Sequence, residues 1–137
     1  MIEHVVILIF LTSLTYFDVK TKRLPLRLVI GFGLFIILTC LVNGHFESWE
    51  VLIRMMPGIF LLMIAFITKE AIGYGDGFVI LLIGLMLDIQ ISIRFILIAL
   101  LLSALASISL LFLKKGDRQT RIPFIPFLLM AWCIYIF

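Results

Sequence analysis

Charged side chains are scarce in this sequence of 137 residues. They make up 14% of the chain, whereas hydrophobic residues make up 64% and the mean hydropathy is +1.31. Soluble domains contain about a quarter charged residues and about half apolar ones. A water-soluble fold of this length has no core large enough to bury such an excess, but a lipid bilayer accepts it. The composition therefore excludes a soluble globular domain and predicts an integral membrane protein.

Cysteine is also scarce, and the two that are present, Cys40 and Cys133, lie far apart within apolar stretches. They form no CxxC pair and no cysteine–histidine spacing of the kind that binds zinc. We interpret them as packing residues and expect no metal site and no cofactor. The net charge of +3 is spread over short loops between apolar runs. This pattern is typical of membrane topology and not of a surface that binds nucleic acid.

Six apolar runs predict an all-α membrane protein of about six transmembrane helices, with residues 1–137 forming a single domain. The first run lacks a basic segment before it and a small-residue cleavage site after it, which favours an uncleaved span over a signal peptide. Most runs are shorter than the about 20 residues that cross an average bilayer. The expected spans are Ile2–Phe17, Leu28–Val42, Val51–Thr68, Phe78–Leu87 (or as far as Ile93), Phe95–Leu113 and Ile122–Phe137.

Basic residues are distributed unevenly between the connections. The first, third and fifth connections hold nine of the eleven, whereas the second and fourth contribute only Arg54 and Arg94. Loops rich in lysine and arginine stay in the cytoplasm. We therefore expect the odd-numbered connections to be cytoplasmic and both termini to lie outside the cell.

Two aspartates stand at the cytoplasmic ends of expected spans. Asp18 ends the first span, and Asp76 precedes the fourth in a segment that also contains Gly73, Gly75 and Gly77. Glycine gives the backbone conformations closed to other residues and lets another chain approach closely. Either aspartate alone is also explained as a boundary charge, Asp76 as a helix cap. Two ionisable residues on one side of a membrane together favour a functional site.

A pair of carboxylates has a specific chemistry in a low-dielectric setting. Two that lie close together do not both ionise easily, so the pair shares a proton. The ionised member then acts as a general base on water, while the protonated member polarises a carbonyl group and later protonates the leaving amine. Asp18 and Asp76 would in this way hydrolyse a peptide bond without a metal ion or a nucleophilic serine or cysteine.

Three separated segments resemble motifs of the prepilin peptidase family, the membrane aspartic proteases of the GxGD type. Asp18 is followed by basic residues and by a Leu-Pro that ends at Pro25, like the basic stretch and Ile-Pro-Asn of the family. The tetrapeptide Gly-Tyr-Gly-Asp ending at Asp76 resembles the second-aspartate motif. Residues 121–128, which include Pro123 and Pro126, resemble the Ile-Pro-Phe-Gly-Pro-Phe segment that opens the last helix of the family.

The resemblance implies that Asp18 and Asp76 are the catalytic pair. It also implies a substrate, namely type IV prepilins or pseudopilins, whose basic leader would be cut from a hydrophobic helix at the cytoplasmic face of a prokaryotic cell membrane. Proline is well tolerated in the first turn of a helix, so we favour a structural role for the prolines. The residues expected to shape the site are Gly73, Gly75, Gly77, Pro25, Pro123 and Pro126.

The sequence also departs from the family pattern. Many members carry an N-terminal region with paired CxxC motifs, thought to serve methylation of the new pilin terminus; this sequence lacks it, and we expect protease activity without methyltransferase activity. Leu26 stands where asparagine is usual, Val79 where lysine is usual, and Ile125 where glycine is usual. These changes bear on local geometry and substrate preference. The particular substrate, the oligomeric state and the separation of the two aspartates stay open.

Two other classes of protein compete with the peptidase. A small transporter or channel subunit would use Asp18 and Asp76 to relay protons or bind a cation. It does not explain why both acids lie at one membrane face, nor the proline-containing segment that resembles the peptidases. A scaffold protein leaves both aspartates without a purpose. We therefore place the peptidase first.

Overall fold

A computed structural model describes residues 2–21, 25–42, 44, 48–68, 73–113 and 122–137 of the chain. Over these residues the protein contains six α-helices and no β-strand, which confirms the predicted all-α fold. Their exposed surface is strongly apolar, as expected of helices that face lipid. The helices are α1 (Ile2–Thr21), α2 (Leu26–Val42), α3 (Ser48–Ile67), α4 (Tyr74–Met86), α5 (Ile89–Phe112) and α6 (Ile125–Ile136).

The helix boundaries differ from the apolar runs at the polar ends. Helix α1 continues past Phe17 to Thr21, so Asp18 lies within the helix and not after it. Helix α4 begins at Tyr74, and Asp76 is part of its first turn. Hydropathy misses these turns because it reports the preference for lipid, whereas a helix is defined by backbone hydrogen bonds that continue into the polar ends.

The fourth run ends earlier than its longest predicted extent. Helix α4 stops at Met86, and Asp88 stands at the N-terminal cap of α5, where its carbonyl accepts the backbone N–H of Ser92 at 2.9 Å. Arg94 therefore belongs to the first turns of α5 and does not separate two helices. By length and composition, α1, α3 and α5 are able to cross a bilayer, while α2, α4 and α6 are shorter apolar helices.

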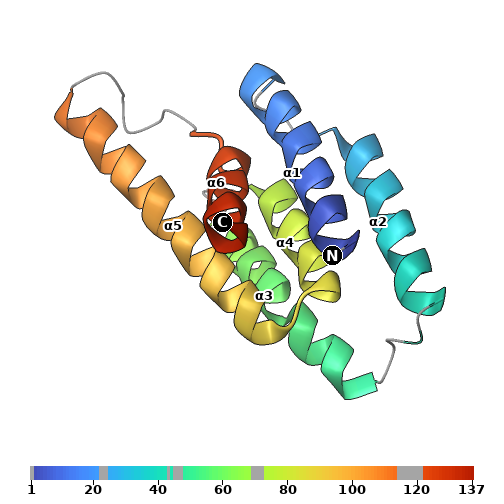
Figure 1. Cartoon of the computed structure of the whole chain (residues 1–137). Coiled ribbons are helices and arrows are strands. Elements are labelled where there is room, and N and C mark those ends of the chain that lie inside the picture. Colours follow the sequence, from blue (N-terminus) through green and yellow to red (C-terminus); the bar gives the residue numbers. More distant parts are fainter. Residues whose placement is uncertain (1, 22–24, 43, 45–47, 69–72, 114–121) are drawn as a thin grey trace.

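Consecutive helices alternate in direction (Figure 1), so the ends of α1, α3 and α5 and the beginnings of α2, α4 and α6 lie toward one end of the bundle. Helix α6 packs against α1 and α5, and α4 packs against α2, α3 and α5. Most basic residues that predicted the membrane orientation lie in connections outside the described residues, so the orientation stays a prediction.

Glycines allow α3 and α4 to pack closely. A Cβ atom on Gly77 would lie 2.7 Å from Cδ2 of Leu62, and one on Gly84 would lie 2.6 Å from the carbonyl oxygen of Arg54. On α3, a Cβ on Gly58 would overlap the backbone of Leu81. Small residues at such contacts are typical of membrane helices, where close backbone packing replaces the hydrophobic effect as the source of association. The position of α4 is therefore set by α3 along its whole length.

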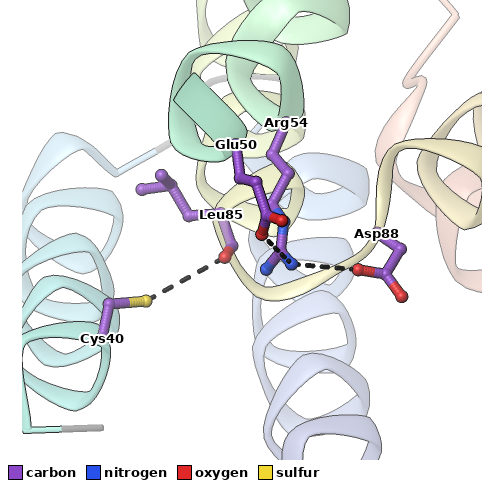
Figure 2. A network of polar contacts seen from close by, with 5 residues as sticks. All are labelled: Cys40, Glu50, Arg54, Leu85 and Asp88. Atoms are coloured by element: carbon purple, nitrogen blue, oxygen red, sulfur yellow. Dashed lines mark hydrogen bonds and ion pairs between the residues drawn. The ribbon is translucent and has the colours of Figure 1, made fainter. Parts of the chain in front are cut away.

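A polar cluster joins α3 to the link between α4 and α5 (Figure 2). The Arg54 guanidinium lies 3.1 Å from a carboxylate oxygen of Asp88 and 3.4 Å from one of Glu50. Nearby, the Cys40 thiol points toward the carbonyl oxygen of Leu85, at 4.0 Å. These contacts lie at the end of α4 opposite to Asp76, because Asp76 is in the first turn and Leu85 in the last.

Candidate active site

Asp18 is the one charged residue that is buried in the described part of the chain, with 7% of its surface exposed. It continues the buried face of α1, since Ile7, Leu11 and Leu14 precede it at helical spacing and are each at most 1% exposed. Residues three and four apart lie on the same face of a helix. The spacing along α1 therefore directs the Asp18 carboxylate into the bundle and away from lipid.

The Asp18 carboxylate is bonded to the beginning of α6. Its Oδ2 accepts a hydrogen bond from the backbone N–H of Ile125 at 3.2 Å, across 107 residues of sequence. The first N–H groups of a helix have no partner within the helix, and they attract negative charge. Asp18 thus stabilises the beginning of α6, and the helix in return offers a donor to the carboxylate.

Asp76 lies in the first turn of α4 and is half-buried. Its backbone N–H donates to the carbonyl oxygen of Gly73 at 3.1 Å, and Gly73 is the N-cap residue. Gly73 makes no side-chain hydrogen bond to this helix end, and Asp76 is the acidic residue of the first turn, where a negative charge is favourable. The carboxylate lies against Gly73, where a Cβ atom would be 3.2 Å from Oδ2 of Asp76.

The glycines around Asp76 act through their lack of a side chain. Among the described glycines, only Gly44 has a positive φ, so unusual backbone conformations are not their contribution here. Gly73 leaves room for the carboxylate of Asp76, and Gly77 lets α4 approach Leu62 of α3. Both glycines therefore fix where the carboxylate stands.

The two aspartates come from different helices and interact with each other. Their carboxylates are close enough for the charge of Asp18 to act on Asp76. Like charges at short range favour a state in which one carboxylate is ionised and the other protonated. Such a pair supplies one base and one acid at the same place. Among the described residues, no group of three or more histidine, cysteine or acidic side chains is arranged to hold a metal ion.

The prolines predicted to shape the site begin helices next to it. The carbonyl oxygen of Pro25 accepts the backbone N–H groups of Leu28 and Val29, at 2.9 and 3.3 Å, so Pro25 caps α2. Pro123 precedes α6, and Pro126 lies in its first turn. These positions agree with a structural role, because proline lacks the N–H that a first helical turn leaves without a partner.

The residues that depart from the family pattern lie in three different environments. Leu26 is 70% exposed at the beginning of α2, whereas Val79 is completely buried in α4. The side chain of Ile125 is also completely buried, but its backbone N–H contacts Asp18. Sequence reasoning missed this contact. The segment around Pro126 drew attention to the region, but no pattern of side chains identifies a backbone donor.

Comparison with models of protein families gives one match: residues 5–108 match the model described as the type IV leader peptidase family. The matched region includes both aspartates and the glycine segment, and it ends before α6. A search of curated proteins and a search of solved structures found no match to the chain. The family model covers more than half of the sequence.

Proposed function

The chain belongs to the type IV leader peptidase family, and from this we propose that it is an aspartic endopeptidase of the membrane that uses Asp18 and Asp76 as its catalytic pair. One observation carries the proposal. The bundle buries a single charged residue among those described, Asp18, and a second carboxylate from another helix lies within its electrostatic reach. Burial of an ionisable residue is costly, and in membrane proteins it usually accompanies function.

The pair supports hydrolysis of a peptide bond in two steps, each of which includes two proton transfers. The ionised carboxylate takes a proton from water, and the resulting hydroxide adds to the carbonyl carbon while the protonated carboxylate gives its proton to the carbonyl oxygen. The tetrahedral intermediate then collapses. The carbon–nitrogen bond breaks, the first carboxylate gives its proton to the amine, and the second recovers a proton from the hydroxyl group. The products are an acid and an amine, and the pair returns to its starting state.

The substrate class follows from the family and from the location of the pair. We infer a prepilin or pseudopilin that has a basic leader before an apolar helix, cut at the cytoplasmic face of a prokaryotic cell membrane. Asp18 and Asp76 lie near helix ends and not halfway along the helices, which suits a bond at the boundary between leader and apolar helix. A basic leader is drawn to an anionic membrane surface. Methyl transfer is not part of the proposed activity.

Leader removal in cells that make both enzyme and substrate tests the proposal. A prepilin is co-expressed with the wild type, with Asp18→Asn and with Asp76→Asn, and the leader is followed by a mobility shift. The matched control is Asp88→Asn, the same chemical change at an exposed carboxylate at the other end of α4. We expect cleavage with the wild type and the control, and none with the two site variants. Cleavage at the wild-type rate by either site variant would contradict the proposal, and proton or cation flux in liposomes without any cleavage would favour the transporter.

A further inference from the structure

The first turn of α6 directs one backbone N–H toward Asp18. The N–H groups of Phe127 and Leu128 both donate to the carbonyl oxygen of Phe124, at 3.0 and 3.2 Å. Pro126 has no N–H to offer. The N–H of Ile125 is therefore the donor that this turn leaves for another partner, and it is bonded to Oδ2 of Asp18.

Both partners of this hydrogen bond are held rigidly. The side chain of Ile125 is completely buried and begins the inner face of α6, which continues through Leu128, Ala131 and Trp132, all completely buried. Helix α6 packs against α1, the helix that carries Asp18. Well-packed side chains fix the backbone to which they belong. The donor and the carboxylate consequently keep their relative positions without help from a substrate.

The surroundings of the two aspartates are unequal. Burial disfavours ionisation of both carboxylates, but Asp18 also accepts a peptide N–H at a helix N-terminus, and this favours its ionised form. Asp76 also lies in a first helical turn, but no hydrogen bond to its carboxyl is found in the described part of the chain. The charge of Asp18 in turn acts on Asp76 and disfavours a second charge there. If one proton is shared, it therefore belongs on Asp76.

We propose that the backbone N–H of Ile125 is a positioning group that keeps Asp18 ionised, so that Asp18 is the general base of the pair and Asp76 is the general acid. This assignment rests on the proposed peptidase function. Oδ2 of Asp18 is held by Ile125, and Oδ1 takes the proton from water. Asp76 gives its proton to the carbonyl oxygen, and Asp18 later passes the proton from water to the leaving amine. In this arrangement α6 acts through Asp18.

An amide-to-ester replacement at residue 125 removes the N–H and leaves the isoleucine side chain in place. The corresponding ester is introduced by an α-hydroxy acid during translation, and cleavage of a prepilin in liposomes is measured from acidic to basic pH. We expect kcat to fall by about tenfold and the acidic limb of its pH profile to move up by about one pH unit, which is the effect of losing one hydrogen bond to a charged group. KM is expected to stay unchanged, because the proposed role of the Ile125 N–H is to hold Asp18 and not to bind substrate.

Phe127 provides the matched control. An ester there also removes one N–H from the first turn of α6, but that N–H is bonded to Phe124 and not to Asp18. The pH profile of this control is expected to match the wild type. Equal shifts in both esters would show that fraying of α6 is the cause and would overturn the inference. If the ester at residue 125 has the same pH profile as the wild type, the role of the Ile125 N–H is also overturned, but the peptidase proposal stands. If the wild-type protein itself does not cleave the prepilin, the peptidase proposal is refuted.

Infrared spectroscopy tests the same assignment without an ester, in case the ester protein does not fold. At neutral pH the wild type is expected to show the carbonyl stretch of a protonated carboxyl group. The band is expected to disappear in Asp76→Asn and to weaken in Asp18→Asn, because the charge of Asp18 that disfavours ionisation of Asp76 is then gone. A band that stays in Asp76→Asn would place the proton on Asp18 and would reverse the roles of base and acid. A side-chain variant, Ile125→Val, keeps the N–H and is expected to lower the melting temperature without moving the pH profile.

Discussion

Replacing Gly77 by alanine tests how α3 sets the position of Asp76. A new Cβ atom would lie 2.7 Å from Cδ2 of Leu62, 2.9 Å from its Cγ and 3.3 Å from its backbone nitrogen. Ordinary van der Waals contact begins at 3.4 Å. The Leu62 side chain must therefore turn away, and α4 must also move outward, because a backbone atom does not give way. Asp76 precedes Gly77 directly and moves with the helix.

The magnitude follows from overpacking and from misplacement of a reacting group. Extra atoms in a well-packed contact typically cost about 1–3 kcal/mol. Alanine returns about 1 kcal/mol of this through its higher helix propensity, so we expect a modest fall in melting temperature. A displacement of about 1 Å at a reacting group costs about 100-fold in rate. The smaller shift at Asp76 is expected to lower leader cleavage by roughly 10- to 100-fold.

The assay compares kcat and melting temperature for Gly77→Ala and Gly84→Ala in the same lipid. Gly84 faces a backbone atom, 2.6 Å from the carbonyl oxygen of Arg54, which gives way less easily than the Leu62 side chain, but Gly84 lies two turns farther from Asp76. Gly84→Ala is therefore expected to lower the melting temperature more than Gly77→Ala, but to lower the activity less. Adding Leu62→Ala to Gly77→Ala removes the closest atoms and is expected to restore most of the activity. Equal losses of activity in both glycine variants, or no recovery in the double variant, would refute the reasoning.

Two further substitutions have outcomes that follow from individual contacts. Gly73→Ala places a Cβ atom 3.2 Å from Oδ2 of Asp76. We expect kcat to fall several-fold with little change in melting temperature. Gly31→Ala is the control, because a Cβ atom there has nothing within 4 Å, and its kcat should match the wild type. Arg54→Gln removes the ion pairs to the exposed carboxylates of Asp88 and Glu50. Exposed ion pairs contribute about 0–1 kcal/mol, so we expect a slightly lower melting temperature and an unchanged rate of cleavage. A large loss of cleavage would show that the two ends of α4 do not act separately.

Much of the architecture is predictable from hydropathy, because lipid selects apolar helices over nearly their whole length. The six runs predict the six helices in order, and the helical spacing of Ile7, Leu11, Leu14 and Asp18 is enough to place the carboxylate on the buried face of α1. The helix ends are less predictable. Asp76 precedes an apolar run in the sequence, yet it lies inside α4 because the backbone hydrogen bonds begin with Tyr74.

The tertiary contacts of the site could not be predicted from local sequence. The glycine segment suggested unusual backbone conformations and close approach of another chain. Gly73 and Gly77 provide space, and which helix packs against α4 in that space is not given by the local sequence. The partner of Asp18 is a backbone N–H from α6, 107 residues away. Every residue except proline carries such a donor, so residue type gives no sign that Ile125 supplies it.

The rate of leader cleavage by purified protein in liposomes, under single-turnover conditions, shows whether Asp18 and Asp76 act as one catalytic unit. The variants are Asp18→Asn, Asp76→Asn and the double variant that carries both changes. Groups that act as a unit are strongly non-additive, because losing one disables the other. The account predicts that each single variant is as slow as the double variant, while the wild type removes the leader. Losses that multiply between the two sites, or a single variant that retains the wild-type rate, would contradict a catalytic pair formed by Asp18 and Asp76.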